Sequence, residues 1–199
     1  MPTVTIDGQS IEVKPGSTII EAADLLGIFI PRFCYHPKLS VVAQCRQCMV
    51  EIQEPAPPPG APPRPFTACS TPVADGMVVS TKSEVAIQAQ KAVVEFLLLN
   101  HPLDCPICDQ GGECPLQDIT MGFGESLTRN EFVRRTYPKL DISAFIEPEM
   151  NRCVHCTRCI RFSDEIDGAS EFGFVERGDR TMIDTYHDLD ISVKSTVSG

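Results

Sequence analysis

Ten cysteines in 199 residues fall into three groups along the chain, and this clustering constrains the fold more than any other feature. In the central group His101 stands ahead of Cys105 and Cys108, and Cys114 follows. Thiolates are soft ligands that suit iron–sulfur clusters and zinc. A compact set of cysteines with a histidine therefore predicts a metal site in this part of the chain.

The residues among these ligands predict a loop. Gly111 and Gly112 leave the backbone bare where it must wrap closely around something. Pro106 and Pro115 directly follow cysteines, so we expect neither position to belong to a hydrogen-bonded element.

Composition limits the classes of function. Residues 1–7 have neither a basic start nor an apolar run, so we expect no secretory signal, and a cysteine-rich chain without one favours metal binding over disulfides. The net charge is −10 and there is no lysine or arginine tract, which argues against nucleic-acid binding. No apolar run approaches the length of a membrane span, so we expect no direct membrane insertion.

The beginning of the chain predicts a β-grasp ferredoxin-like domain. Residues 3–7 and 10–13 alternate in polarity around an Asp-Gly turn, which is typical of a hairpin. Thr18 and Glu21 fit the capping box of a helix that ends at Gly27.

The cysteines of this domain, Cys34, Cys45, Cys48 and Cys69, have the spacing C-x10-C-x2-C-x20-C. The plant-type [2Fe–2S] pattern is C-x4-C-x2-C with a remote fourth cysteine, so the first gap is longer here. A zinc site built from the same four thiolates is the alternative. We expect His36 to be a turn residue and not a ligand.

The remainder of this domain and a long helix follow. Strands are expected at residues 50–52 and 77–80, with a proline-rich surface insertion at 54–65 between them. A helix is expected over residues 83–100, ended by Pro102. Its predicted apolar face comprises Ala86, Ala89, Val93, Phe96 and Leu97. His101 then stands just past a rigid helix, either as a ligand or as a capping residue.

The third group is Cys153, Cys156 and Cys159, after residues 119–150, which we interpret as a wrapping linker. Its C-x2-C-x2-C spacing is the start of the bacterial [4Fe–4S] run, and no fourth cysteine follows in this sequence. We expect His155 to be solvated or to stand behind the ligands.

Beyond this group the sequence predicts a short helix at 162–166 that Gly168 closes, and a hairpin formed by residues 172–177 and 181–186. Four arginines adjoin the cysteine groups and could offset the negative charge of thiolates, although exposure to solvent is the alternative for each: Arg46, Arg152, Arg158 and Arg161.

In these motifs the chain resembles the large iron–sulfur subunit, the G-type subunit, of NADH:quinone oxidoreductase (respiratory complex I). The residues that carry the resemblance are 31–36, 45–48, 156–162 and above all 100–114, which reads Asn-His-Pro-Leu-Asp-Cys-Pro-Ile-Cys-Asp-Gln-Gly-Gly-Glu-Cys. The resemblance implies an α+β chain with three modules. They are a [2Fe–2S] β-grasp domain at 1–82, a helix with a [4Fe–4S] domain of one histidine and three cysteine ligands at 83–122, and a linker with a partial [4Fe–4S] ferredoxin-like domain at 123–199.

The resemblance also implies the ligands. One [2Fe–2S] cluster is expected on Cys34, Cys45, Cys48 and Cys69, and one [4Fe–4S] cluster on His101, Cys105, Cys108 and Cys114. A second [4Fe–4S] cluster would use Cys153, Cys156 and Cys159, with a fourth cysteine expected beyond Gly199. The chain would then be a fragment, truncated before that ligand, with one or two [4Fe–4S] clusters.

The function that the resemblance implies is electron relay from NADH, through a flavoprotein subunit, toward quinone. Partners would be that flavoprotein and other peripheral-arm subunits, at the cytoplasmic face of a bacterial inner membrane. An equivalent subunit of an NAD-linked hydrogenase or formate dehydrogenase is a close alternative, and a zinc-bound structural or partner-binding module is one of another class. We find no nucleotide-binding glycine loop and no nucleophile–base pair, so we expect the chain to serve as a subunit of an enzyme without catalytic residues of its own.

Overall fold

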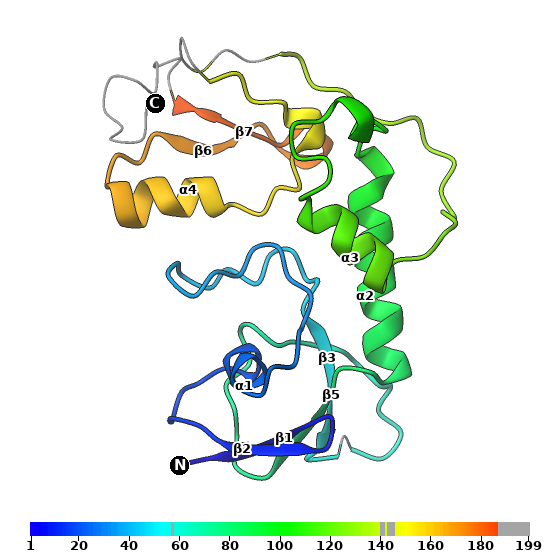
Figure 1. The fold of residues 1–199 in the computed structure, drawn as a ribbon, viewed down its shortest axis with the longest axis vertical. Helices are drawn as coiled ribbons and strands as arrows, with labels where there is room; N and C mark the ends of the chain where they lie inside the picture. Colours follow the sequence, from blue (N-terminus) through cyan, green and yellow to red (C-terminus); the bar gives the residue numbers. More distant parts are fainter. Residues whose placement is uncertain (57, 140–141, 143–145, 187–199) are drawn as a thin grey trace.

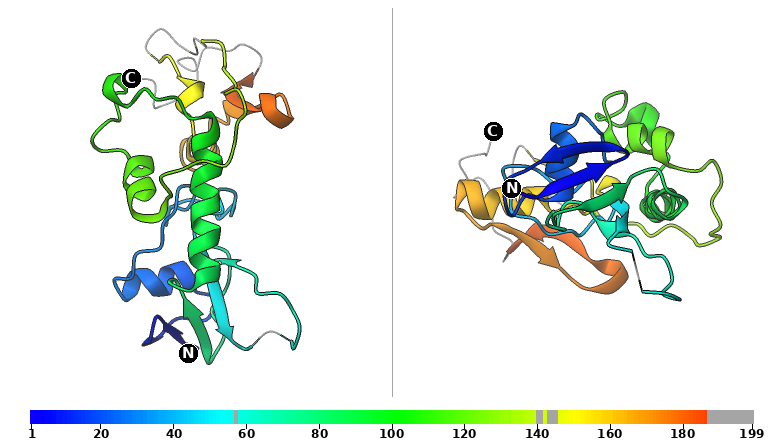
Figure 2. Two further views of the ribbon diagram at one scale, coloured as in Figure 1. Left: turned by 90° about the vertical axis from the view of Figure 1, so that its right-hand side faces the viewer. Right: turned by 90° about the horizontal axis from the view of Figure 1, so that it is seen from below.

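The protein is described by a computed structural model, which covers residues 1–56, 58–139, 142 and 146–186. A five-stranded sheet lies at one end of the molecule and a two-stranded hairpin at the other. A long helix, α2 (Glu84–Asn100), runs along the side and connects the two ends (Figures 1 and 2).

The predicted β-grasp domain is confirmed. Strands β1 (Thr3–Ile6) and β2 (Gln9–Glu12) form the antiparallel hairpin. Strand β5 (Met77–Ser80) pairs parallel with β1 and antiparallel with β3 (Met49–Glu54), and the short β4 (Phe66–Thr67) completes the order β2-β1-β5-β3-β4.

Helix α1 (Ile19–Leu25) packs against this sheet. Its capping interaction is present, since the Thr18 N–H donates to the Glu21 carboxylate at 2.8 Å. The chain leaves the helix through Gly27, whose φ of 72° only glycine adopts readily. Ile19 and Ile20 are fully buried in a core that includes Val4 and Val50, so this domain has a hydrophobic core of its own.

Helix α2 begins and ends where the sequence predicts. The Ser83 hydroxyl accepts a hydrogen bond from the Ala86 N–H at 3.2 Å, and the helix ends one residue before His101. Its predicted face is wrong in part. The buried positions are Ala86, Gln90 and Val94, whereas Phe96 is 71% exposed. A polar residue can lie on the buried face because Gln90 donates a hydrogen bond to the backbone of β3.

The predictions that Pro106 and Pro115 lie outside hydrogen-bonded elements are wrong. Pro106 is inside a 3₁₀ turn, Cys105–Ile107, and Pro115 is the first residue of helix α3 (Pro115–Phe123). The first helical position has no intrahelical use for an N–H, so proline is tolerated there and its fixed φ suits the helix. A prediction that placed Pro115 at the first position of a helix, where proline is tolerated, would have found α3.

The third part of the chain has the predicted helix and hairpin, but the helix begins at Arg158, four residues earlier than predicted, and the strands are shorter. Helix α4 (Arg158–Phe162) continues as a π-helical turn, Ser163–Asp167, which Gly168 closes. Strands β6 (Phe172–Val175) and β7 (Met182–Thr185) form the antiparallel hairpin. The fourth cysteine expected beyond Gly199 falls outside the described residues.

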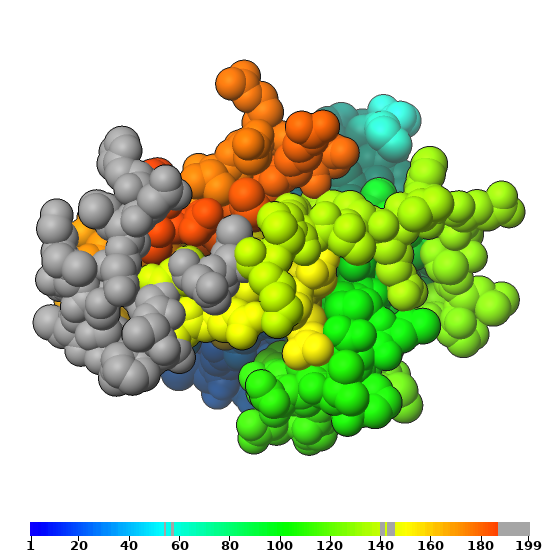
Figure 3. Space-filling view, turned by 90° about the horizontal axis from the view of Figure 1, so that it is seen from above, coloured from blue at the N-terminus to red at the C-terminus, as the bar shows by residue number. Residues whose placement is uncertain are grey.

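Residues 125–139 carry no regular element and cross this end of the molecule. In the view from above they lie between the green helices and the orange hairpin (Figure 3). The Arg135 N–H donates to the Asn100 side chain, and the Tyr137 hydroxyl donates to the Thr181 carbonyl. The predicted linker of residues 119–150 is therefore wrong at 119–123, which belong to α3, whereas residues 125–139 wrap across this end as expected.

A second, smaller core joins all three parts of the chain. Its buried members are Phe33, Val94, Leu116 and Ile119. Cysteines from each of the three predicted sites, Cys45, Cys114 and Cys156, pack against it. In the described part of the chain, no helix is both long and apolar enough to cross a membrane.

Candidate metal centres

The four cysteines of the first domain come together. The Cys34 side chain is in hydrogen-bonding contact with those of Cys45 and Cys69, and Cys48 contacts Cys69. Cys34, Cys48 and Cys69 are buried, and Cys45 is half-buried. Three of them lie in the segment between α1 and β3, whereas Cys69 follows β4, so the sheet brings the remote fourth cysteine to the other three.

Hydrogen bonds among these thiols separate their acidities. Contacts from Cys45 and Cys69 lower the pKa of Cys34 to about 2, and a hydrogen bond from Cys69 lowers the pKa of Cys48 to about 7. The same contacts raise the pKa values of Cys45 and Cys69. Negative charge thus concentrates at this site at neutral pH, and the thiolate is the form that binds metal.

The backbone of the ligand loop is shaped for an anionic group. The Cys34 N–H points at the Cys45 sulfur at 3.4 Å. Ala43 and Arg46 have φ values of 50° and 58°, which non-glycine residues seldom adopt. Left-handed residues within such loops turn successive N–H groups to one side and create concave sites, many of which hold phosphates or iron–sulfur clusters.

The second set of ligands lines one cavity. His101, Cys105, Cys108 and Cys114 all border a cavity of about 250 Å³ between the end of α2 and α3. Gly111 closes it on one side, where a Cβ would lie 2.7 Å from the Cys105 carbonyl oxygen. The sequence prediction for Gly111 is thereby confirmed, because only a residue without a side chain fits there.

Burial favours the ligand form of His101, and a cation borders the same cavity. Burial lowers the pKa of the His101 imidazole, which keeps the ring neutral near pH 7 and able to bind metal. Arg152 also borders the cavity and forms an ion pair with Asp104 at 3.0 Å, one residue before Cys105. The guanidinium thus brings positive charge to a site rich in thiols.

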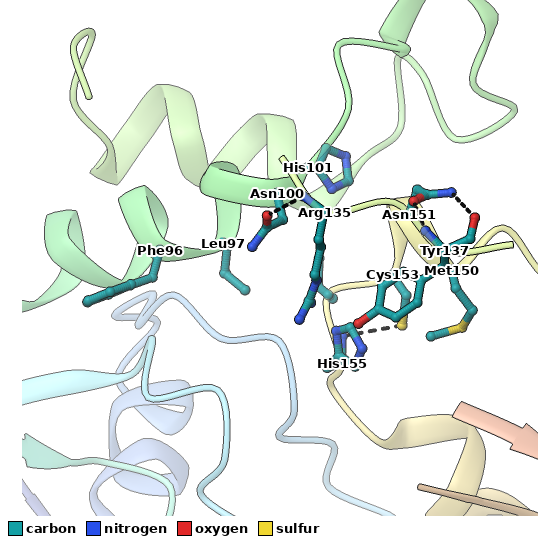
Figure 4. A pocket seen from close by; sticks show the side chains of 11 residues that line it. Phe96, Leu97, Asn100, His101, Arg135, Tyr137, Met150, Asn151, Cys153 and His155 are labelled. Carbon is teal, nitrogen blue, oxygen red and sulfur yellow. Dashed lines mark hydrogen bonds between the residues drawn. The ribbon is translucent and has the colours of Figure 1, made fainter. Parts of the chain in front are cut away.

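The third set is less closely gathered. Cys153, Cys156 and Cys159 are near enough for their charges to interact, and burial raises the pKa values of Cys153 and Cys159. Cys153 borders a cavity of about 70 Å³ that it shares with His101 (Figure 4), whereas Cys159 borders an apolar groove beside Phe162.

His155 is half-buried, so its side chain is solvated only in part. Its ring nitrogen lies 3.1 Å from the Thr181 carbonyl oxygen, and its backbone N–H points at the Cys153 sulfur at 3.3 Å (Figure 4). His155 and Thr157 have φ values of 52° and 60°, so this loop repeats the left-handed residues of the first site. The second expectation, a residue behind the ligands, agrees with these contacts.

Each of the first two sites offers four donors. A structural zinc ion needs four donors within about 2.0–2.3 Å of one point. Across the residues that the structure describes, no three His, Cys, Asp or Glu side chains are grouped closely enough to hold a single metal ion.

Arg161 is one of the four arginines that the sequence singles out, but its burial was not predicted. Adjacent arginines were expected to be either exposed or charge-compensating, but Arg161 is only 5% exposed. Its position two residues after Cys159, on the buried side of a short helix, was the available signal. Arg158, one turn earlier, donates to the Tyr35 carbonyl at 2.7 Å.

The fold and these sites define an iron–sulfur protein with a ferredoxin-like domain. Comparison with family models gives three matches in chain order. They are a "2Fe-2S iron-sulfur cluster binding domain" at residues 1–84, an "NADH-ubiquinone oxidoreductase-G iron-sulfur binding region" at 90–126, and an "NADH-quinone oxidoreductase subunit 3, ferredoxin-like domain" at 143–199. The chain belongs to the family of the large iron–sulfur subunit of NADH-quinone oxidoreductase, and it corresponds to the iron–sulfur region of that subunit.

Two relatives of known family are consistent with this assignment. The chain is 46% identical over 186 residues to the NADH-ubiquinone oxidoreductase 75 kDa subunit of Reclinomonas americana, covering 94% of this chain and 26% of that one. It is 42% identical over 199 residues to the G-type subunit of NADH-quinone oxidoreductase from Rickettsia bellii, covering 100% of this chain and 28% of that one. The chain therefore spans about a quarter of the length of these relatives.

A solved structure of an NAD⁺-reducing [NiFe]-hydrogenase also matches. The TM-score is 0.81 at 27% identity, over 93% of this chain and 75% of that one. The fold is thus shared between two kinds of oxidoreductase.

Proposed function

We propose that this chain is an electron-relay segment of an NADH-quinone oxidoreductase, carrying electrons from an NADH-oxidising flavoprotein subunit toward quinone. The ligands would be Cys34, Cys45, Cys48 and Cys69 for a [2Fe–2S] cluster, and His101, Cys105, Cys108 and Cys114 for a [4Fe–4S] cluster. Cys153, Cys156 and Cys159 would supply three ligands of a second [4Fe–4S] cluster. The corresponding modules would be residues 1–82, 83–122 and 123–199.

The convergence of His101, Cys105, Cys108 and Cys114 on one cavity is the observation that carries this proposal. Two of these residues lie in or directly before short helical elements and one follows a 17-residue helix, so the ligand set is fixed by the fold. When bound, clusters supply the one-electron redox chemistry. The residues of this chain hold the ligands in place and set the local charge.

The protein would adjust the reduction potential of each cluster through the charges and N–H donors close to it. Reduction adds an electron to an already anionic centre, so nearby cations and N–H donors favour the reduced form. At the second site the Arg152 guanidinium is so placed, and at the first site the N–H of Cys34 points at a ligand sulfur. The neutral imidazole of His101 removes one negative charge compared with a fourth thiolate.

The same relay in an NAD-linked hydrogenase is the second candidate. The hydrogenase match, at a TM-score of 0.81, is the observation in its favour. The higher identity of the complex I relatives, 46% against 27%, favours the first. Identification of the subunits that co-purify with the native chain distinguishes an NADH-quinone oxidoreductase from an NAD-linked hydrogenase.

The first candidate includes a location and neighbours. The chain would attach peripherally at the cytoplasmic face of a bacterial inner membrane, with the flavoprotein and other peripheral-arm subunits beside it.

Metal and sulfide analysis, with EPR of the dithionite-reduced protein, tests the relay itself. We expect iron and acid-labile sulfide in nearly equal amounts and at least two distinguishable signals, one of [2Fe–2S] type and one of [4Fe–4S] type. Zinc without sulfide, and no reducible EPR signal, would replace this proposal with a zinc-bound structural module.

A further inference from the structure

The loop of the first site and the helix of the third site meet across a single buried cation. The Arg161 guanidinium donates to the Cys34 carbonyl at 2.5 Å and to the Ser40 carbonyl at 2.6 Å. It also donates to the Cys156 carbonyl at 3.3 Å and to the Thr157 hydroxyl at 3.4 Å. One side chain therefore touches the backbone of a proposed ligand at each of two sites.

The charge of this group has no carboxylate partner in the described part of the chain. None of the five ion pairs found there includes Arg161, and all four of its acceptors are neutral oxygens. Glu165, one turn further on, has a lowered pKa, chiefly because Ser40 donates to it and only last because of the Arg161 charge. A buried charge without a counter-charge is costly, and proteins retain one where something else supplies the opposite sign.

Other contacts hold the same two segments together. Arg158 donates to the Tyr35 carbonyl, and the Gln44 side chain donates to the His155 carbonyl at 3.0 Å. In Figure 1 the loop after α1 reaches up toward α4, which agrees with these contacts. Arg161 therefore shares the docking of these segments with two other side chains, and of the three groups it is the buried one.

We propose that Arg161 is a positioning residue and a shared counter-cation for the first and third cluster sites, with its positive charge stabilising the reduced state of both. This rests on the proposed function, because the negative charge that it offsets is that of the thiolates and clusters. At the second site Arg152 has a carboxylate partner in Asp104, which offsets its charge, whereas none of the ion pairs of the described residues includes Arg161.

The test is an EPR-monitored redox titration of the full-length chain with its clusters loaded. Arg161→Met removes the charge at similar side-chain length, Arg161→Lys keeps the charge but loses the planar fork, and Arg180→Met removes a charge from an exposed position on the same module. For Arg161→Met we expect the reduction equilibrium constants at the first and third sites to fall at least threefold each. A tenfold fall would be about 59 mV for one electron. The His101 site and the Arg180→Met control should titrate like the wild type.

Arg161→Lys separates charge from positioning. We expect both equilibrium constants within about threefold of wild type, with faster hydrogen exchange at amides 34–44 because fewer carbonyls are held. If Arg161→Met does not load its clusters, Arg161→Lys becomes the test of the charge role. A change in the reduction potential of the first or the third site in Arg161→Lys would then overturn that role.

Wild-type potentials at either site in loaded Arg161→Met would also overturn the proposal, since a shared counter-cation must affect both. A wild-type protein without iron and sulfide would instead refute the proposed function, and the counter-cation role with it. Shifted potentials in Arg161→Met would establish the counter-cation role. Faster hydrogen exchange with unchanged potentials in Arg161→Lys would establish the positioning role.

Discussion

His101 is the one nitrogen donor among the proposed ligands, and at the residue scale its effect is one of charge. A neutral imidazole adds no charge to a cluster, whereas a thiolate adds one. Cysteine-to-histidine differences raise the potentials of Rieske centres for that reason. We therefore expect His101→Cys to retain a cluster and to lower its potential.

A redox titration of the two proteins measures this shift. His36→Cys is a suitable control, because the His36 ring accepts a hydrogen bond from the Lys38 N–H within a turn and we place no cluster on it. Equal potentials in His101→Cys and wild type, with clusters intact in both, would make His101 a helix cap and no ligand.

Cys108 tests the same cavity through a thiolate. Because folding around a metal depends on its ligands, Cys108→Ser should lose most of the [4Fe–4S] signal of this site and loosen residues 101–114. The [2Fe–2S] signal should survive, since that domain has its own core. Iron content and EPR measure both effects.

Ile107→Ser is the matched control for Cys108→Ser. Ile107 is 74% exposed and adjoins Cys108, so this change should leave the spectrum as it was. Unchanged iron and [4Fe–4S] signals in Cys108→Ser would remove Cys108 from the ligand set.

At the scale of elements, the contact between α2 and β3 depends on two glutamines. The buried Gln90 side chain donates to the Met49 carbonyl at 2.7 Å, and the Gln47 side chain donates to the Gln90 carbonyl at 3.3 Å. Gln47 stands between two proposed ligands, Cys45 and Cys48. The helix is therefore tied directly to the first site and not merely to its domain.

We expect Gln90→Ala to lower the free energy of unfolding by about 1–3 kcal/mol, because a buried carbonyl loses its side-chain donor. Gln88→Ala, on the exposed side of the same helix, should change it by less than about 0.5 kcal/mol. Denaturant unfolding of the two variants measures the difference. Equal effects would mean that this hydrogen bond does not hold α2 to the sheet.

Elements with a local signal could be predicted from the sequence, and those decided by tertiary contacts could not. The Asp-Gly hairpin, the Ser83 cap and the Gly168 stop each depend on neighbours in the chain, and each is confirmed. The parallel pairing of β1 with β5 joins residues more than 70 positions apart, so no local pattern contains it. Helix α3 was missed by placing Pro115 outside the helix when it belongs at the first position.

The grouping of the cysteines of the first domain was predictable for a similar reason. The spacing within C-x2-C pairs is a local property, and the structure brings Cys34, Cys45, Cys48 and Cys69 together as expected. The buried face of α2 was misjudged because Gln90 counts as polar in the sequence, although its partner on β3 makes its burial favourable. The sequence singled out Arg161 by its place beside Cys159, but its burial could not be predicted, because its acceptors lie up to 127 positions away.

At the scale of the whole molecule, stability is unevenly distributed. The β-grasp domain has a core of sixteen buried residues, whereas the core that joins the three parts has four. The segments around the second and third sites are short turns and loops that bury little. Small modules of this kind usually need a metal or another crosslink to stay folded.

Removal of the clusters by chelator under oxidising conditions should therefore unfold the molecule in parts. We expect hydrogen exchange in strands β1, β3 and β5 to remain slow, while amides in 101–114 and 150–160 exchange much faster. Exchange mass spectrometry before and after iron removal measures this. Uniform acceleration along the chain would show that the first domain also depends on its cluster.

Four residues of the proposed ligand loops, Ala43, Arg46, His155 and Thr157, hold left-handed backbone conformations without being glycine. Each such residue costs roughly 1–2 kcal/mol relative to the right-handed form. Glycine at these positions would remove that cost, but it would also let the empty loop sample many more shapes. Binding of a cluster would therefore have to offset this cost, so these four positions exchange some affinity for a defined shape of the ligand loops.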